Sequence, residues 1–171
     1  MAENRFGIQI DKGLSQSWQQ QYIVASGTAA GIAAGTPTKL VTADASVAGV
    51  IVPMVDGDGI VTAMRFTGVS KDTSTETAAA AGVCNVWAPV PGILYRAKAK
   101  SSTAVDTQAE INALMGKKTL FDLTSANWTV DTATADALIN CVVIAGGIPA
   151  SSEVLFVYSP KGTIFDTSTA M

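Results

Sequence analysis

The clearest alternation of hydrophobic and polar residues follows a break in the chain at Pro89–Gly92. Two prolines and a glycine within four residues interrupt a helix or a central strand, so a turn is expected there. Two sets of residues alternate after this turn: Ile93, Tyr95, Ala97 and Ala99 on one side, and Leu94, Arg96, Lys98 and Lys100 on the other. A period of two predicts a strand with one buried face and one wet, basic face.

Other apolar runs predict further short strands. Val47–Val55 and Ile60–Thr67 flank Asp56–Gly59, a sequence typical of a hairpin turn. The connection from Val69 to Gly82 is polar and then rich in alanine, which indicates an exposed loop. The remaining strand candidates are Val83–Trp87, Thr119–Leu123, Trp128–Val130, Cys141–Ile144, Val154–Tyr158 and Thr163–Phe165. The uniformly apolar Val154–Tyr158 predicts a strand buried on both faces. Trp87 is expected to be mostly buried in the core.

One short helix is expected at Thr107–Met115. Thr107 and Glu110 have the spacing of a capping box, and Gly116 is a suitable residue for ending the helix. Its predicted apolar stripe consists of Ile111, Leu114 and Met115. Short strands, frequent turns and one helix together predict a mainly β fold, a small antiparallel β-barrel or sandwich with one short α-helix.

Residues 1–38 are predicted to form an extended N-terminal arm, and residues 39–171 a single β-rich globular domain. From Ala25 to Gly49, 18 of 25 residues are Ala, Gly, Ser or Thr, so few large side chains are present to offset the ordering entropy. Glycines at 27, 31 and 35 have the spacing of a helix-pairing motif, but the flanking glutamines and Pro37 favour an extended arm. An arm of this kind can order against a partner through large side chains. The candidate anchors are Phe6, Ile8, Ile10, Leu14, Trp18, Tyr22 and Ile23.

Composition and charge restrict the classes of partner. The net charge of −3 lacks the basic excess of a general nucleic-acid binder, so no direct contact with nucleic acid is expected. No apolar run has the length of a membrane span, and the first residues do not form a signal peptide, so synthesis in the cytoplasm is expected. Only 15% of the residues are charged, against roughly 25% in typical domains. Such a surface suits a protein packed against copies or partners, although an Ala/Thr-rich composition alone also explains it.

The sequence offers little chemistry. It contains no histidine, the commonest general base and metal ligand. Cys84 and Cys141 lie in apolar runs and are expected to be buried thiols, with a disulfide as the alternative. Asp56–Gly59 resembles the start of a calcium loop, but Thr67 occupies the place of the final glutamate, which favours a hairpin turn. We therefore expect no catalytic residue, metal or cofactor.

Arg96, Lys98 and Lys100 form the one cluster of like charges in the sequence. Two interpretations stay open for it. The cluster is a candidate contact for an acidic partner surface or a phosphate. Alternatively, it is a solvated strand face that discourages pairing between sheet edges.

An Ala/Gly/Thr-rich arm ahead of a small β domain with one helix resembles the capsid decoration (cement) proteins of tailed bacteriophages. The segment VWAPVPGILYRAKAK and the later DTQAEINALMG are similar in style to their β-tulip or lambda-type domains. The resemblance implies a non-enzymatic virion protein, made in the host cytoplasm, that binds the major capsid protein as a homotrimer and stabilises the outer capsid surface. The alternatives are another self-assembling virion component, such as a tail, fibre or spike subunit, and a histidine-free enzyme using carboxylate pairs.

Overall fold

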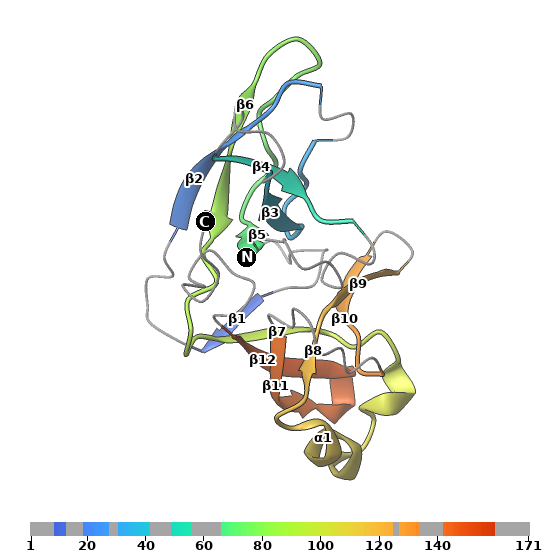
Figure 1. Ribbon diagram of the computed structural model, residues 1–171. Coiled ribbons are helices and arrows are strands. Elements are labelled where there is room, and N and C mark those ends of the chain that lie inside the picture. Colours follow the sequence, from blue (N-terminus) through green and yellow to red (C-terminus); the bar gives the residue numbers. More distant parts are fainter. Residues whose placement is uncertain are drawn as a thin grey trace.

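The computed structural model is mainly β and consists of a closed barrel above an open sheet, which carries one α-helix and a two-stranded hairpin (Figure 1). It describes residues 9–12, 19–27, 31–41, 49–55, 66–124, 127–133 and 142–159. Within these ranges the predicted class, a mainly β fold with a small barrel and one short helix, is confirmed.

Five strands close the barrel. In order around its wall they are β2 (Gln19–Val24), β4 (Val50–Pro53), β3 (Pro37–Leu40), β5 (Phe66–Ser70) and β6 (Gly82–Trp87). The β2–β4 pair is parallel and the other pairs are antiparallel, so the predicted antiparallel barrel has one exception. The buried residues inside it are Tyr22, Val24, Ile32, Ile51, Cys84 and Val86.

The second layer is an open sheet in which all pairs are antiparallel. Its order is β1 (Gln9–Lys12), β7 (Leu94–Lys98), β12 (Glu153–Tyr158), β11 (Val142–Ile148) and β8 (Lys118–Thr119). The helix α1 (Gln108–Leu114) packs against β11, and β9 (Phe121–Thr124) pairs with β10 (Asn127–Val130). Two short 3-10 helices, η2 (Ser102–Ala104) and η3 (Pro149–Ser151), complete the elements of this layer.

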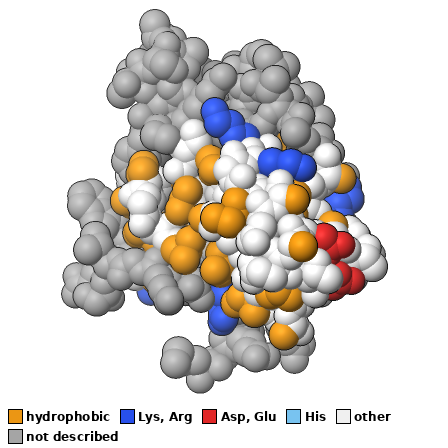
Figure 2. Space-filling model, turned by 90° about the horizontal axis from the view of Figure 1, so that it is seen from below, with side chains coloured by type: hydrophobic (Ala, Val, Ile, Leu, Met, Phe, Trp, Pro, Cys, Tyr) orange, Lys and Arg blue, Asp and Glu red, His pale blue; other side chains and the backbone are white. Residues whose placement is uncertain are grey.

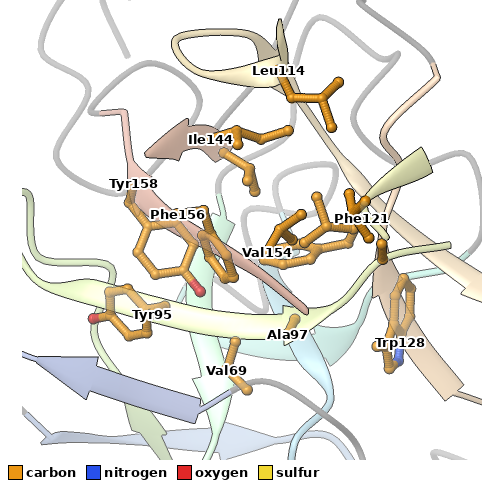
Figure 3. Packing of buried hydrophobic residues seen from close by; sticks show 14 of the residues in the cluster. Val69, Tyr95, Ala97, Leu114, Phe121, Trp128, Ile144, Val154, Phe156 and Tyr158 are labelled. Atoms are coloured by element: carbon orange, nitrogen blue, oxygen red, sulfur yellow. The ribbon is translucent and has the colours of Figure 1, made fainter. Parts of the chain in front are cut away.

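A shared aromatic core joins the two layers. Phe66 of barrel strand β5 is fully buried, and its ring centroid lies 5.7 Å from that of Phe121 and 5.1 Å from that of Tyr158. Tyr95, Phe156 and Tyr158 gather on the inner face of the open sheet, where Leu114 of α1 approaches Ile144 (Figure 3). The barrel therefore contributes Met54, Phe66 and Val69 to the core of the open sheet, while its interior keeps a smaller cluster of its own.

The local signals at the predicted helix are confirmed. The Thr107 hydroxyl accepts a hydrogen bond from the Glu110 amide, and the Glu110 carboxylate accepts one from the Thr107 amide, which completes the capping box. Ile111 and Leu114 are buried, but Met115 is 54% exposed. The prediction for Met115 was wrong because the helix has already ended there and the chain turns away through Gly116, whose φ is +80°.

Strand periodicity was correct for β7 but only half correct for β12. Tyr95 and Ala97 are buried, and Arg96 and Lys98 face the other way, as predicted. In β12, buried residues alternate with partly exposed ones, so this strand is fully buried on one face and not on two.

Pairing across the barrel could not be predicted from the turn sequence at Asp56–Gly59. Strands β4 and β5 do not pair with each other, because β3 lies between them. The predicted turn itself falls outside the residues that the structure describes. Closure of the barrel, and not the local turn sequence, determines that β3 lies between β4 and β5.

The predicted boundary between an arm ending at residue 38 and a globular domain starting at residue 39 stays a prediction, and only part of residues 1–38 is described. The chain is extended there, as expected, in β1 and β2. However, β1 pairs with β7, and β2 pairs with both β4 and β6. From this stretch, Tyr22, Val24 and Ile32 lie in the buried cluster of the barrel.

Candidate interaction surfaces

The first candidate surface is the outer face of the open sheet, made by the partly exposed apolar side chains of Leu94, Val143, Leu155 and Val157. They alternate with the buried residues of the same strands, and Val143 lies directly opposite Val157 across the β11–β12 pair. Seen from this side of the molecule, hydrophobic side chains gather at the centre, and basic ones lie along the border (Figure 2). We call this set the sheet patch. None of its four residues was predicted as part of a site. The apolar residues Leu155 and Val157, at positions that face outward, were the feature of the sequence that indicated this surface.

Two basic residues predicted as a charged contact border the sheet patch. Lys98 donates a hydrogen bond to the Ser151 carbonyl at 2.6 Å, and its Nζ lies 3.5 Å from a Glu153 carboxylate oxygen. Arg96 is half-buried opposite Leu155. Strand β7 lies between β1 and β12, so these charges do not border an open sheet edge, although Lys98 is exposed as expected of a solvated strand face.

Lys100, the third predicted basic residue, belongs to a different cluster. Its Nζ lies 2.7 Å from Asp122 and 3.5 Å from Asp131, whose side chains are only 11% and 7% exposed. The hydrogen bond to Asp122 raises the pKa of Lys100 above its usual value, and the Lys100 amide donates to the Val130 carbonyl at 2.9 Å. Lys100 therefore fastens the β9–β10 hairpin to the end of β7 and does not join Arg96 and Lys98 in one contact surface.

A second candidate surface runs along the outside of the barrel on β2 and β6. Three pairs of residues face each other in register: Gln19 and Trp87, Gln21 and Asn85, and Ile23 and Val83. Ile23 is 55% exposed and Val83 is 36% exposed. We call this set the barrel strip. Its six residues carry no charge, although Lys71 lies beside it, with its Nζ 5.3 Å from the Trp87 ring centroid and 2.9 Å from Gln19 Oε1.

Trp87 lies in this strip rather than in the core, where the sequence pattern had placed it. Its side chain is only partly buried, with Lys71 over its ring. The register turns Trp87 outward, because Trp87 pairs with the exposed Gln19 and alternates with the buried Val86. Trp128 is the buried tryptophan of the shared core.

The predicted arm anchors are not brought together into one surface. Tyr22 is buried inside the barrel and cannot serve as a partner contact, whereas its neighbour Ile23 is exposed. Ile10 lies in β1 at the register position of Tyr95. Phe6, Ile8, Leu14 and Trp18 fall outside the residues that the structure describes.

The described residues offer little reactive chemistry. Cys84 is a free, buried thiol, as predicted. Burial, with smaller effects of the Asp72 and Glu76 carboxylates, raises the pKa of its thiol to about 12. It is thus protonated at neutral pH and a poor nucleophile or metal ligand. In the ranges described, no group of three or more His, Cys, Asp or Glu side chains is placed to hold a metal ion.

A pair of exposed carboxylates lies at the start of α1. A hydrogen bond with Glu110 raises the pKa of Asp106, whereas the Thr107 hydroxyl, followed by Asp106, lowers the pKa of Glu110. Glu110 also closes the capping box, so this pair has a structural role in starting the helix.

Comparison of the chain with protein-family models, with curated proteins and with solved structures finds no match. Among the described helices, none is long and apolar enough to cross a membrane. The surfaces themselves are therefore the basis for a functional proposal.

Proposed function

We propose that this protein is a non-enzymatic structural protein of a virion, which binds the major capsid protein as a homotrimer and stabilises the outer surface of a bacteriophage capsid. The observation that carries the proposal is the sheet patch. An apolar centre made by Leu155, Val157 and their neighbours, with a border of hydrogen-bonded charges such as Lys98, has the layout of a protein–protein interface.

A single copy would attach to the capsid through a small apolar surface. Burying apolar surface contributes roughly 25 cal/mol per Å², and part of this gain offsets the loss of freedom on binding. A single sheet patch therefore supports weak attachment. Three copies held together would bind far more firmly, because the second and third contacts become intramolecular.

The test is cosedimentation of the purified protein with undecorated capsids. Val157→Asp introduces a charge into the sheet patch and is expected to weaken binding at least about tenfold, because an unpaired charge would be buried at the interface. Val55→Asp, the same kind of change at an exposed apolar residue outside both candidate surfaces, is the matched control and should leave binding within about twofold. Circular dichroism and thermal melting establish that both variants are folded.

Three outcomes count against the proposal. Wild-type binding by a folded Val157→Asp variant would exclude the sheet patch as the contact. Failure of the full-length protein to bind capsids would remove the function. Binding to purified tails and not to capsids would favour the alternative, a tail or fibre component.

A further inference from the structure

The edge of the open sheet at β7 has a distinctive occupant, the N-terminal strand β1. This strand is four residues long, and its sequence, QIDK, contains one apolar residue. Its register against β7 is irregular, with a shift between Ile10 and Lys12. Within the part of the chain that the structure describes, β7 is the only strand with which β1 pairs. Its few regular pairs and single apolar residue indicate that β1 is held more weakly than the interior strands β7, β12 and β11.

Strand β7 does not depend on β1 for its own position. On its other side it pairs with β12 at four successive positions, from Lys98 opposite Glu153 to Tyr95 opposite Phe156. Its inner face is fixed by Tyr95 and Ala97, which are 2% and 1% exposed, and by the stacked Tyr95 and Phe156 rings, 5.8 Å apart. If β1 left, β7 would remain in place with an open row of backbone donors and acceptors, a template for another strand.

The connection from β1 to the barrel is short. Residues 13–18, six in number, separate Lys12 from Gln19, the first residue of β2. These residues span at most about 24 Å when extended, so β1 can reach only an acceptor close to its own barrel. Short connections of this kind favour exchange of a terminal element between copies.

We propose that β1 exchanges between copies of this chain, so that residues 9–12 of one copy pair with β7 of its neighbour. The second copy is the occupant that fits the edge, since it presents the same strand with the same register that β7 already accepts. The exchange creates a head-to-tail contact, which closes into a ring when the rotation between copies allows it. The inference rests on the self-association within the proposed function and not on capsid binding.

Mixing two single-cysteine chains tests the exchange directly. Both carry Cys84→Ala and Cys141→Ser. One also carries Gln9→Cys and the other Arg96→Cys, at positions that are Cα partners across β1 and β7. Cross-strand partners lie about 4.5–5.5 Å apart, within the range that a disulfide spans. Under mild oxidation, a covalent heterodimer of the two chains is expected on a non-reducing gel, at least about fivefold above the control mixture.

The control mixture combines the Gln9→Cys chain with a Lys118→Cys chain. Lys118 is exposed at β8, the opposite edge of the sheet, and reports random encounters. Inserting six Gly/Ser residues after Gly13 should reduce the heterodimer several-fold, because a longer connection favours pairing within one chain. The double variant Gln9→Cys/Arg96→Cys shows whether the pair can form a disulfide at all.

The exchange is overturned if the double variant cross-links only within one chain and the mixture gives no heterodimer above the control. Capsids are absent from this experiment. Failure of the exchange would therefore leave capsid binding unaffected, and failure of capsid binding would leave the exchange unaffected.

Discussion

Phe66 should be the side chain on which the joint stability of the barrel and the open sheet depends. It is fully buried, comes from β5, and touches Phe121 and Tyr158 from the other layer. Truncating a buried phenylalanine to alanine typically costs about 3–5 kcal/mol. Each aromatic pair adds about 0.5–1.5 kcal/mol beyond its buried area, so we expect Phe66→Ala to lose about 4–5 kcal/mol.

Phe66→Leu separates the two contributions. Leucine keeps most of the apolar volume but loses both ring contacts, so a smaller loss of about 1–2 kcal/mol is expected. Val55→Ala is the surface control. Val55 is 57% exposed, and its substitution should change the free energy of unfolding by less than about 0.5 kcal/mol.

Urea unfolding followed by far-UV circular dichroism and by tryptophan fluorescence measures all three variants. In the wild type, both probes should report one transition, because the two layers share a core. Two results would refute the reasoning. One is a loss below about 1.5 kcal/mol for Phe66→Ala. The other is separate barrel and sheet transitions in the wild-type protein, which would show that the shared core does not couple the layers.

Two further predictions concern backbone strain and pH. Gly68 has a φ of +132°, and an added Cβ would lie 2.0 Å from the Trp87 carbonyl oxygen, so Gly68→Ala should lower the free energy of unfolding in urea by at least about 3 kcal/mol. The control is Gly92→Ala, at a φ of +88° with open space around it, which should cost only about 1 kcal/mol. Equal costs for the two variants would contradict the clash. The pKa of the Cys84 thiol is raised from 9.0 to about 12 in the folded protein, so the unfolded chain loses this proton first as the pH rises. The free energy of unfolding should therefore fall by about 1.4 kcal/mol per pH unit from pH 9 towards pH 12. Cys84→Ala in a Cys141→Ser background should lose this part of the alkaline slope, whereas the same slope in both proteins would refute the assignment to Cys84.

The features predicted correctly from the sequence were those set by neighbouring residues. The alternation in β7 follows from one buried and one exposed face, and the Thr107–Glu110 capping box needs residues only three positions apart. The turn after Pro89 likewise follows from residues within a few positions of one another. Such local signals keep their meaning whatever the rest of the chain does.

The features that could not be predicted depend on distant partners. Lys98 and Lys100 look like members of one basic face, but they pair with different acceptors. Glu153 lies in β12, Asp122 lies in β9, and Asp131 directly follows β10. The place of β2 in the barrel was missed because its neighbours, β4 and β6, are chosen by closure of the barrel. Only two of the six residues of β2, Tyr22 and Val24, are buried, which gives no strong hydrophobic period to indicate this.

The candidate surfaces could be predicted only in part. Ile23 was predicted as an anchor along the arm, and the structure places it, 55% exposed, in a strand of the barrel wall. The sheet patch on β12 was hidden by its uniform apolar sequence, which is equally consistent with a fully buried strand. Only the register with β7 and β11 shows which of its faces is turned outward.

The placement of β2 between β4 and β6 has a consequence for synthesis on the ribosome. Strand β6 begins at Gly82, 58 residues after Val24 (82 − 24), so β2 is made long before its antiparallel neighbour exists. At roughly 5–20 residues per second, this interval lasts about 3–12 seconds. During that time the nascent chain carries a completed strand segment that cannot yet close its wall and is open to pairing with neighbouring nascent chains. Crowded polysomes should therefore favour misassembly of this protein, and a slower rate of initiation, by spacing the ribosomes, should increase the yield of folded protein.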